Sequence, residues 1–158
     1  MRGVTSKDDR PDTPGREEEG RMSELSTDVI TMVREHAGRG FGGGIGLEYG
    51  EVGPDKVVTT VKVGPHLFQP FGLVHGGVYC AIAEEVASVA GAVWLGGEGR
   101  VVGVNNSTDF LRAVTEGTIT ATGTPVHRGR SQQLWRVEMT DDRDRLVAVG
   151  QVRLANLR

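Results

Sequence analysis

The chain has 158 residues, of which 37 % are hydrophobic and 25 % are charged, and its net charge is -3. This size and composition indicate one globular domain, and the small negative charge excludes a general nucleic-acid binder. The one cysteine excludes an internal disulfide framework and the four scattered histidines give no zinc-type spacing, so we expect a reducing, cytoplasmic setting and no metal.

The N-terminal segment, residues 1–21, is rich in charge, contains two prolines and has almost nothing to bury, which predicts a disordered tail. Met22 is an alternative start of the chain. The remainder, residues 22–158, is expected to form a single domain. Its first element is a helix over residues 23–38 that ends at Gly38 and has one apolar face, made of Leu25, Val29, Met32 and Val33.

The centre of the chain predicts two strands and a long helix. A flexible glycine-rich connector, residues 38–46, precedes the sequence LEYGEVGPDKVVTTVKVGP, in which the turn Gly53-Pro54-Asp55 separates two strands. An apolar helix from about Gly76 to Leu95 follows and ends at Gly96-Gly97.

The last third of the chain has the alternating pattern of strands. Four strands are expected, over residues 100–114, 117–129, 132–142 and 145–157, with a hairpin turn that begins at Asp141-Asp142. Runs of strands rather than βαβ alternation predict an α+β fold, and a helix that is apolar nearly all round must be covered on most sides. We therefore expect a curved antiparallel sheet wrapped around one long central helix. No run of about 18 apolar residues and no signal-peptide core are present, so we expect no membrane span.

Two adjacent acidic residues, Glu84 and Glu85, stand in the middle of this apolar helix. On a helical wheel of about 100° per residue, Glu85 shares a side with valines and isoleucine, whereas Glu84 shares a side with small residues. A buried carboxylate is costly unless it is paired, so Glu84 is a candidate functional residue, and Ser88 one turn later can reach it. The alternative is that one glutamate meets solvent or a partner subunit.

The helix begins at His75-Gly76-Gly77, where unpaired N–H groups lie at the positive end of the helix dipole. A carbonyl docked there would have its developing oxyanion stabilised. With a carboxylate nearby and the amide of Gln69 in the preceding loop, this indicates acyl transfer or hydrolysis. A Cys80–His75 nucleophile pair is disfavoured, because Cys80 occupies a small apolar helix position and no third orienting group is evident.

These residues resemble the signature of hotdog-fold acyl-CoA thioesterases of the PaaI-like and 4-hydroxybenzoyl-CoA type. That signature is a Gln or Asn, then His-Gly-Gly, then an acid nine residues after the His. Gln69, His75, Gly76 and Glu84 match it, and Ser88 matches a Ser/Thr position four residues beyond the acid. The similarity covers about residues 41–157. The motifs PVHRGR and QLW resemble those of 1,4-dihydroxy-2-naphthoyl-CoA thioesterases, which tend to have a histidine at the position of Phe110.

The resemblance implies a hotdog fold and a role for each matching residue. Glu84 would act as nucleophile or as general base, and the Gly76 N–H would polarise the thioester carbonyl. Gln69 would orient the thioester or the attacking water, unless it is a surface loop amide. Ser88 would hold Glu84, unless it only packs the helix, and His75 would support the helix start or act directly. For Glu85, a polar contact across a subunit interface is expected.

On the substrate side, Arg128 and Arg130 suit the phosphates of coenzyme A, unless they mark a solvated strand end. Ser131 and Arg112 are further candidate substrate-binding residues. Phe110 and Val104 would supply apolar walls for an aromatic or other compact acyl group. The family implies a homo-oligomer, a tetramer built from dimers with the active site at the subunit interface, and no cofactor, nucleic-acid partner or membrane partner. The alternatives are a non-catalytic acyl-CoA-binding or sensing protein of the same fold and a histidine-centred hotdog dehydratase.

Overall fold

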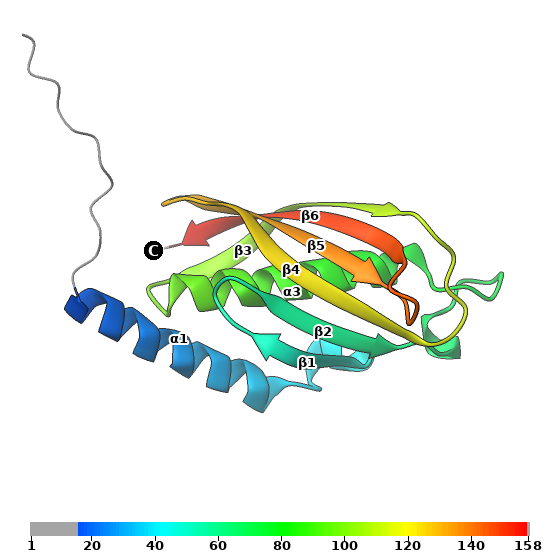
Figure 1. The fold of residues 1–158 in the computed structure, drawn as a ribbon, viewed down its shortest axis with the longest axis horizontal. Coiled ribbons are helices and arrows are strands. Elements are labelled where there is room, and N and C mark those ends of the chain that lie inside the picture. The colour runs from blue at the N-terminus through cyan, green and yellow to red at the C-terminus, as the bar shows by residue number, and fades with distance from the viewer. Residues whose placement is uncertain (1–15, 158) are drawn as a thin grey trace, which may run out of the picture.

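The computed structural model describes residues 16–157, with side chains from Ser26 onward. Its elements in chain order are α1 (Arg16–His36), α2 (Gly40–Gly44), β1 (Leu47–Val52), β2 (Val57–Lys62), the 3₁₀ helix η1 (Pro65–Leu67), α3 (Gly76–Leu95), β3 (Arg100–Phe110), β4 (Thr118–Arg128), β5 (Gln132–Thr140) and β6 (Leu146–Leu157). Within this described part, all strands join one antiparallel sheet in the order β1-β2-β4-β5-β6-β3. The sheet curves over α3, and α1 lies outside it beside β1 (Figure 1).

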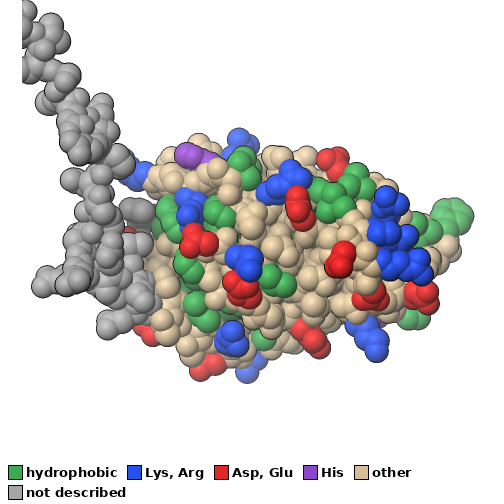
Figure 2. Space-filling view, in the orientation of Figure 1, with side chains coloured by type: hydrophobic (Ala, Val, Ile, Leu, Met, Phe, Trp, Pro, Cys, Tyr) green, Lys and Arg blue, Asp and Glu red, His purple; other side chains and the backbone are tan. Residues whose placement is uncertain are grey.

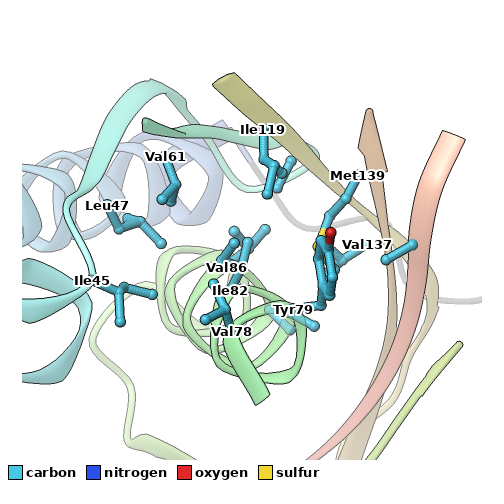
Figure 3. Close-up of a cluster of buried hydrophobic side chains, with 14 of the residues drawn as sticks. Ile45, Leu47, Val61, Val78, Tyr79, Ile82, Val86, Ile119, Val137 and Met139 are labelled. Carbon is cyan, nitrogen blue, oxygen red and sulfur yellow. The ribbon is translucent and has the colours of Figure 1, made fainter. Parts of the chain in front are cut away.

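The core lies between α3 and the concave face of the sheet. Val78, Ile82 and Val86 of α3 point toward valine, isoleucine and methionine side chains from β2, β4 and β5 (Figure 3). Ile82 and Val86 are fully buried, and each such aliphatic side chain contributes roughly 1.5–3 kcal/mol on burial. The predicted alternation of the strands therefore reflects one face packed on a single helix.

The ends of α3 are fixed by its sequence. His75 is the N-cap, and its ring nitrogen Nδ1 accepts a hydrogen bond from the Gly77 N–H at 2.9 Å. Gly96 ends the helix in the left-handed conformation, with φ of 62°, which glycine adopts without strain. The predicted bounds of this helix are confirmed.

By length and composition, α3 could also cross a membrane, since it has 20 residues and a mean hydropathy of 1.5 in its most apolar window. However, 56 % of that window is buried inside the protein. A helix surrounded by its own sheet in this way is a core helix.

A buried hydrogen-bond chain explains the Gln-Leu-Trp motif of β5. The indole Nε1 of Trp135 donates to Oε1 of Gln133 at 2.8 Å, and the Gln133 amide donates to Oδ1 of Asn156 at 2.7 Å. Both Trp135 and Gln133 are completely buried. The motif therefore has a structural role, because it satisfies the polar atoms of two buried side chains.

Three expectations for the N-terminal region need correction. The predicted tail over residues 1–21 lies partly in α1, which begins at Arg16, while residues 1–15 lie outside the described part. Charged residues such as Glu and Arg are strong helix formers, so high charge did not exclude a helix there. The expected connector contains the short helix α2, and Met32, expected on the apolar face of α1, is 52 % exposed.

Strand β3 forms one edge of the sheet and leaves several apolar side chains in solvent: Val102, Val104 and Phe110, which are 41 %, 52 % and 54 % exposed. An edge strand with exposed apolar residues is suited to pair with another chain. Elsewhere, both acidic and basic side chains lie on the face seen in Figure 2, and several basic side chains gather toward its right-hand end.

Candidate active site

The start of α3 presents an unoccupied backbone donor. No hydrogen bond joins the Gly76 N–H to any other described residue, whereas the next N–H, of Gly77, is taken by His75. The ring of Phe110 covers Gly76 closely, since a Cβ on Gly76 would lie 2.5 Å from Phe110 Cε2. Phe110 also packs on Tyr79 with ring centroids 5.7 Å apart. The helix start therefore combines a free N–H with an apolar wall.

Glu84 lies half-buried on the side of α3 that faces β3. Its Oε2 accepts a hydrogen bond from the amide Nδ2 of Asn106 at 3.0 Å. Its Oε1 lies over Gly103, where an added Cβ would come within 1.9 Å of that oxygen. The structure thus gives this carboxylate one polar partner and leaves Oε1 without a hydrogen-bond partner among the described residues.

Ser88 does not hold this carboxylate. No hydrogen bond joins Ser88 to Glu84, although the two residues are one turn apart. The expectation that Ser88 anchors Glu84 is therefore wrong for this structure, because the sheet supplies Asn106 as a donor instead. Ser88 remains a half-buried small residue on the same side of α3.

Glu85 is held by its own chain. The Tyr49 hydroxyl of β1 donates to Glu85 Oε1 at 2.6 Å, and the carboxylate packs against Gly42 of α2. Burial of the Tyr49 hydroxyl, and next its hydrogen bond to Glu85, raise the pKa of Tyr49 above its ordinary value. The expected contact across a subunit interface is thus replaced by a contact within the chain. Glu84 and Glu85 face β3 and β1 respectively.

Gln69 belongs to the tight loop that precedes α3. Its side-chain oxygen Oε1 accepts a hydrogen bond from the Phe71 N–H, and its backbone N–H donates to the Leu73 carbonyl at 2.9 Å. The amide Nε2 of Gln69 makes no hydrogen bond to the other described residues. The loop therefore holds the side-chain carbonyl of Gln69 and leaves its N–H₂ group available to donate to a ligand.

Gly76 and Glu84 do not meet within one chain. Glu84 follows Gly76 by eight residues of α3, which corresponds to about 12 Å along the helix axis. Reacting atoms must approach to about 3–3.5 Å. A thioester whose carbonyl oxygen is bound at one Gly76 N–H is therefore out of reach of the Glu84 carboxylate in the same protomer, and a ligand lying along the helix does not bring both groups to one carbon.

The two arginines of the PVHRGR motif differ in their surroundings. The Nη1 atom of Arg128 donates to Oδ1 of Asp55 at 2.8 Å and to the Pro54 carbonyl at 2.9 Å, and its guanidinium lies 5.5 Å from the ring centre of Trp94. Arg130 is exposed in the β4–β5 loop and makes no ion pair with the described residues. The Arg128 guanidinium thus already has an acidic partner within the chain, whereas Arg130 has none among the described residues, and phosphate binding by Arg128 stays a prediction.

The remaining predicted substrate residues lie on the surface. Arg112 and Ser131 are exposed, and Val104 projects from the exposed edge of β3. Among residues 16–157, no three His, Cys, Asp and Glu side chains gather as a metal-binding cluster.

Comparison with known proteins decides the family. Residues 71–148 match the thioesterase superfamily. The chain belongs to the thioesterase superfamily. It is 33 % identical to the 1,4-dihydroxy-2-naphthoyl-CoA hydrolase of Escherichia coli over 115 residues, which cover 73 % of this chain and 85 % of that protein. With members named as thioesterases and hydrolases among its relatives, the chain is an enzyme of thioester hydrolysis.

Two solved structures are more similar in sequence. Rv1847 from Mycobacterium tuberculosis is 54 % identical, with a TM-score of 0.73 over 75 % of this chain and 96 % of that chain. The AziG protein from S. sahachiroi is 50 % identical, with a TM-score of 0.75 over 76 % of this chain and 98 % of that chain. The expected hotdog architecture of this thioesterase, one sheet around a central helix, is confirmed.

The sequence reasoning missed two residues that contact Glu84. Asn106 and Gly103 lie on β3, and neither belongs to the signature around the helix. A hint was present in the run Gly-Val-Asn-Asn, because glycine and adjacent amides are unusual in the interior of a strand.

Proposed function

We propose that the chain hydrolyses an acyl-CoA thioester with Glu84 as the reactive carboxylate and the Gly76 N–H as the donor to the thioester carbonyl. This proposal rests on the hydrogen bonding and exposure of the Glu84 carboxylate. It is held by one hydrogen bond from Asn106, and its other oxygen is left free on the half-exposed, small-residue side of α3. The N–H of Gly76 lies at the positive end of the same helix, where developing negative charge is stabilised.

Two routes of hydrolysis fit this arrangement. As a nucleophile, Glu84 Oε1 attacks the carbonyl carbon, the C–S bond breaks and coenzyme A leaves as its thiolate. Water then hydrolyses the mixed anhydride, which restores the Glu84 carboxylate, and the proton released from this water converts the thiolate to the thiol. As a general base, Glu84 takes a proton from water, which attacks the carbonyl and expels the same thiol. In both routes the Gly76 N–H stabilises the oxyanion, and the products are a carboxylic acid and free coenzyme A.

The active site requires two chains, since about 12 Å separates the two groups along one helix. When two copies of one helix pack antiparallel across a two-fold axis, a residue that precedes the axis in one helix lies opposite the residue equally far beyond the axis in the other. The midpoint of Gly76 and Glu84 is Cys80, so a two-fold axis beside Cys80 would set Gly76 of one α3 against Glu84 of the partner α3. Cys80 and its neighbour Ala81 are small and half-buried in the single chain, which allows close approach of two helices.

The assembly that follows is a dimer with two equivalent sites, and pairs of dimers would form the tetramer. The exposed edge of β3, with Val102 and Val104, offers a second region for pairing between chains. Because the chemistry uses only a carboxylate, an N–H and water, we propose that no cofactor is needed beyond the coenzyme A of the substrate. The reducing cytoplasm, where acyl-CoA esters occur, is the proposed compartment.

For the acyl group we propose an aromatic or other compact acid. Phe110 lies directly over Gly76, where the thioester carbonyl would bind, and Val104 and Phe71 expose further apolar surface at 52 % and 88 %. The name of the E. coli relative gives a fused aromatic acyl group. Phe110 makes this wall apolar, so a ring with few hydroxyl groups fits better than a heavily hydroxylated one, because buried hydroxyls need partners.

A thiol-release assay with the purified chain tests the proposal. The panel is benzoyl-, hydroxybenzoyl-, dihydroxynaphthoyl-, hexanoyl- and palmitoyl-CoA, compared by kcat/KM. The proposal is supported if coenzyme A is released and the aromatic or short substrates have the highest kcat/KM of the panel. A clear preference for palmitoyl-CoA contradicts the assigned acyl class, and binding of these esters without thiol release contradicts hydrolysis and indicates an acyl-CoA sensor.

A further inference from the structure

We propose that Asn106 is the positioning residue of Glu84: together with an irregularity in β3 it holds one carboxylate oxygen and directs the other toward substrate. This inference rests on the proposed function, because it names the residue that holds the Glu84 carboxylate in its reactive position. It names a residue on a strand, outside the helix and loop that carry the motif.

The irregularity is a β-bulge. Gly103 pairs with Leu154 of β6 and Asn105 pairs with Arg153, so Val104 is an extra residue without a partner of its own. In a regular strand, residues three apart point to opposite faces of the sheet. The extra residue changes this alternation, so that Gly103 and Asn106 both face Glu84.

The orientation of the Asn106 amide follows from its neighbours. Its Nδ2 lies 3.0 Å from the Cys80 carbonyl oxygen and 3.0 Å from Glu84 Oε2. A carbonyl and a carboxylate can only accept, so both amide hydrogens are used. The opposite end, Oδ1, accepts from the Thr108 hydroxyl at 2.7 Å. Asn106 therefore has every polar group engaged and a fixed rotamer.

Two consequences follow for Glu84. The bond from Asn106 occupies Oε2, so Oε1 is the oxygen that attacks the substrate or accepts a proton from water. Because the same amide group also bonds the Cys80 carbonyl one turn earlier in α3, the carboxylate is tied to the helix as well as to the strand. A side chain held this way keeps its reactive geometry before the substrate binds.

The test compares Asn106→Ala with Asn105→Ala in the thiol-release assay. Asn105 is the adjacent asparagine, is exposed and makes no hydrogen bond to Glu84. Loss of a hydrogen bond to a charged group predicts a fall in kcat of roughly 10- to 100-fold for Asn106→Ala, with KM changed less than about threefold. Asn105→Ala should keep the wild-type kcat.

Thr108 provides a second, milder test in case Asn106→Ala does not fold. Thr108→Val removes the hydroxyl that fixes the amide and should lower kcat several-fold, roughly 3- to 10-fold, whereas Thr108→Ser should restore it. Wild-type kcat in both Asn106→Ala and Thr108→Val, with Glu84→Gln inactive, overturns the positioning role alone. A fall in kcat that is matched by an equally large rise in KM in Asn106→Ala would indicate a merely structural role of Asn106, and this result would also overturn the positioning role. Absence of turnover in the wild-type chain instead overturns the proposed function.

Discussion

A Cβ atom on Gly103 would lie 1.9 Å from Oε1 of Glu84. This is far inside van der Waals contact, so any side chain at Gly103 requires the proposed catalytic carboxylate on the opposite helix to move. The backbone of Gly103 is not in the left-handed region, since it is absent from the glycines with positive φ. The restriction therefore comes from the carboxylate and not from the conformation of the strand.

Gly103→Ala should abolish most turnover while the protein still folds, because the methyl group must displace the Glu84 carboxylate. We expect kcat to fall by about 10²-fold or more, comparable with the loss of a catalytic acid or base. The measurement is kcat by thiol release, with thermal unfolding as the check on folding. Gly50→Ala in β1 is the matched control, since its Cβ would meet nothing closer than 3.5 Å. Wild-type kcat in Gly103→Ala would show that Glu84 does not act from this position.

The two-chain site predicts complementation between inactive variants. Glu84→Gln lacks the carboxylate, and Gly76→Pro lacks the N–H at a helix position that tolerates proline. A pyrrolidine at Gly76 meets Phe110, so both chains of this experiment also carry Phe110→Leu. Each variant alone should be inactive. Chains unfolded together and refolded as a mixture should recover about a quarter of the activity of the Phe110→Leu parent, because half of random dimers are mixed and each has one intact site.

The absence of any recovery in that mixture, with mixed dimers present by mass spectrometry, would contradict the two-chain site. Sedimentation of the wild-type chain at the mass of one protomer at micromolar concentration would contradict it as well.

Replacement of Arg130 should alter substrate affinity, whereas replacement of Arg128 should alter stability. Arg130 is exposed without an ion pair among the described residues, so Arg130→Ala should raise KM for an acyl-CoA more than for the matching acyl-pantetheine thioester, which lacks the nucleotide phosphates. Arg128 already contacts Asp55 and Trp94, so Arg128→Ala should lower thermal stability and change both KM values equally. An equal effect of Arg130→Ala on the two substrates would place the coenzyme A phosphates elsewhere.

The two tyrosines of the chain should lose their protons at a higher pH in the folded protein than in the unfolded chain. Burial raises the pKa of Tyr79, and burial followed by the bond to Glu85 raises that of Tyr49, above the ordinary value of 10.0. The folded state therefore keeps protons that the unfolded chain releases, and stability falls as the pH rises above about 10. Absorbance near 295 nm should place the midpoint of tyrosinate formation in the folded protein above that of the chain unfolded in denaturant. A midpoint at or below that of the unfolded chain, with unchanged circular dichroism, would contradict this burial.

The architecture could be predicted because its signals are local. The alternation of Ile119 and Ala121 with threonines marked a strand with one buried face, and the glycines after Leu95 marked the end of the central helix. Helix α2 could not be predicted in this way. Its glycines suggested flexibility, but Gly43 packs so closely on the Gly38 backbone that an added Cβ would lie 2.2 Å away. Close packing and flexibility both require glycine, and the sequence does not distinguish them.

The candidate site could be predicted only as far as the helix and its preceding loop reach. Glu84 lies close in sequence to His75 and Gly76, and all three belong to one helix and its N-cap. Because they belong to one helix, a helical wheel is enough to distinguish the side of Glu84 from that of Glu85. Asn106 meets Glu84 through a strand bulge that follows from pairing with β6 across a large sequence distance. The partner of Glu85, Tyr49, is 36 residues away in the chain. Contacts of this kind depend on tertiary register, which spacing along one sequence does not report.

The catalytic role of Glu84 is tested most directly by the turnover of Glu84→Gln beside Glu85→Gln with saturating benzoyl-CoA. We expect Glu84→Gln to fold with a thermal midpoint close to that of the wild-type chain and to lose about 10²–10⁴-fold in kcat. Glu85→Gln, which alters only the contact with Tyr49, should retain most of its kcat with a modest loss of stability. Turnover of Glu84→Gln within a few-fold of the wild type, or loss of turnover in Glu85→Gln alone, would contradict the assignment of Glu84 as the catalytic carboxylate.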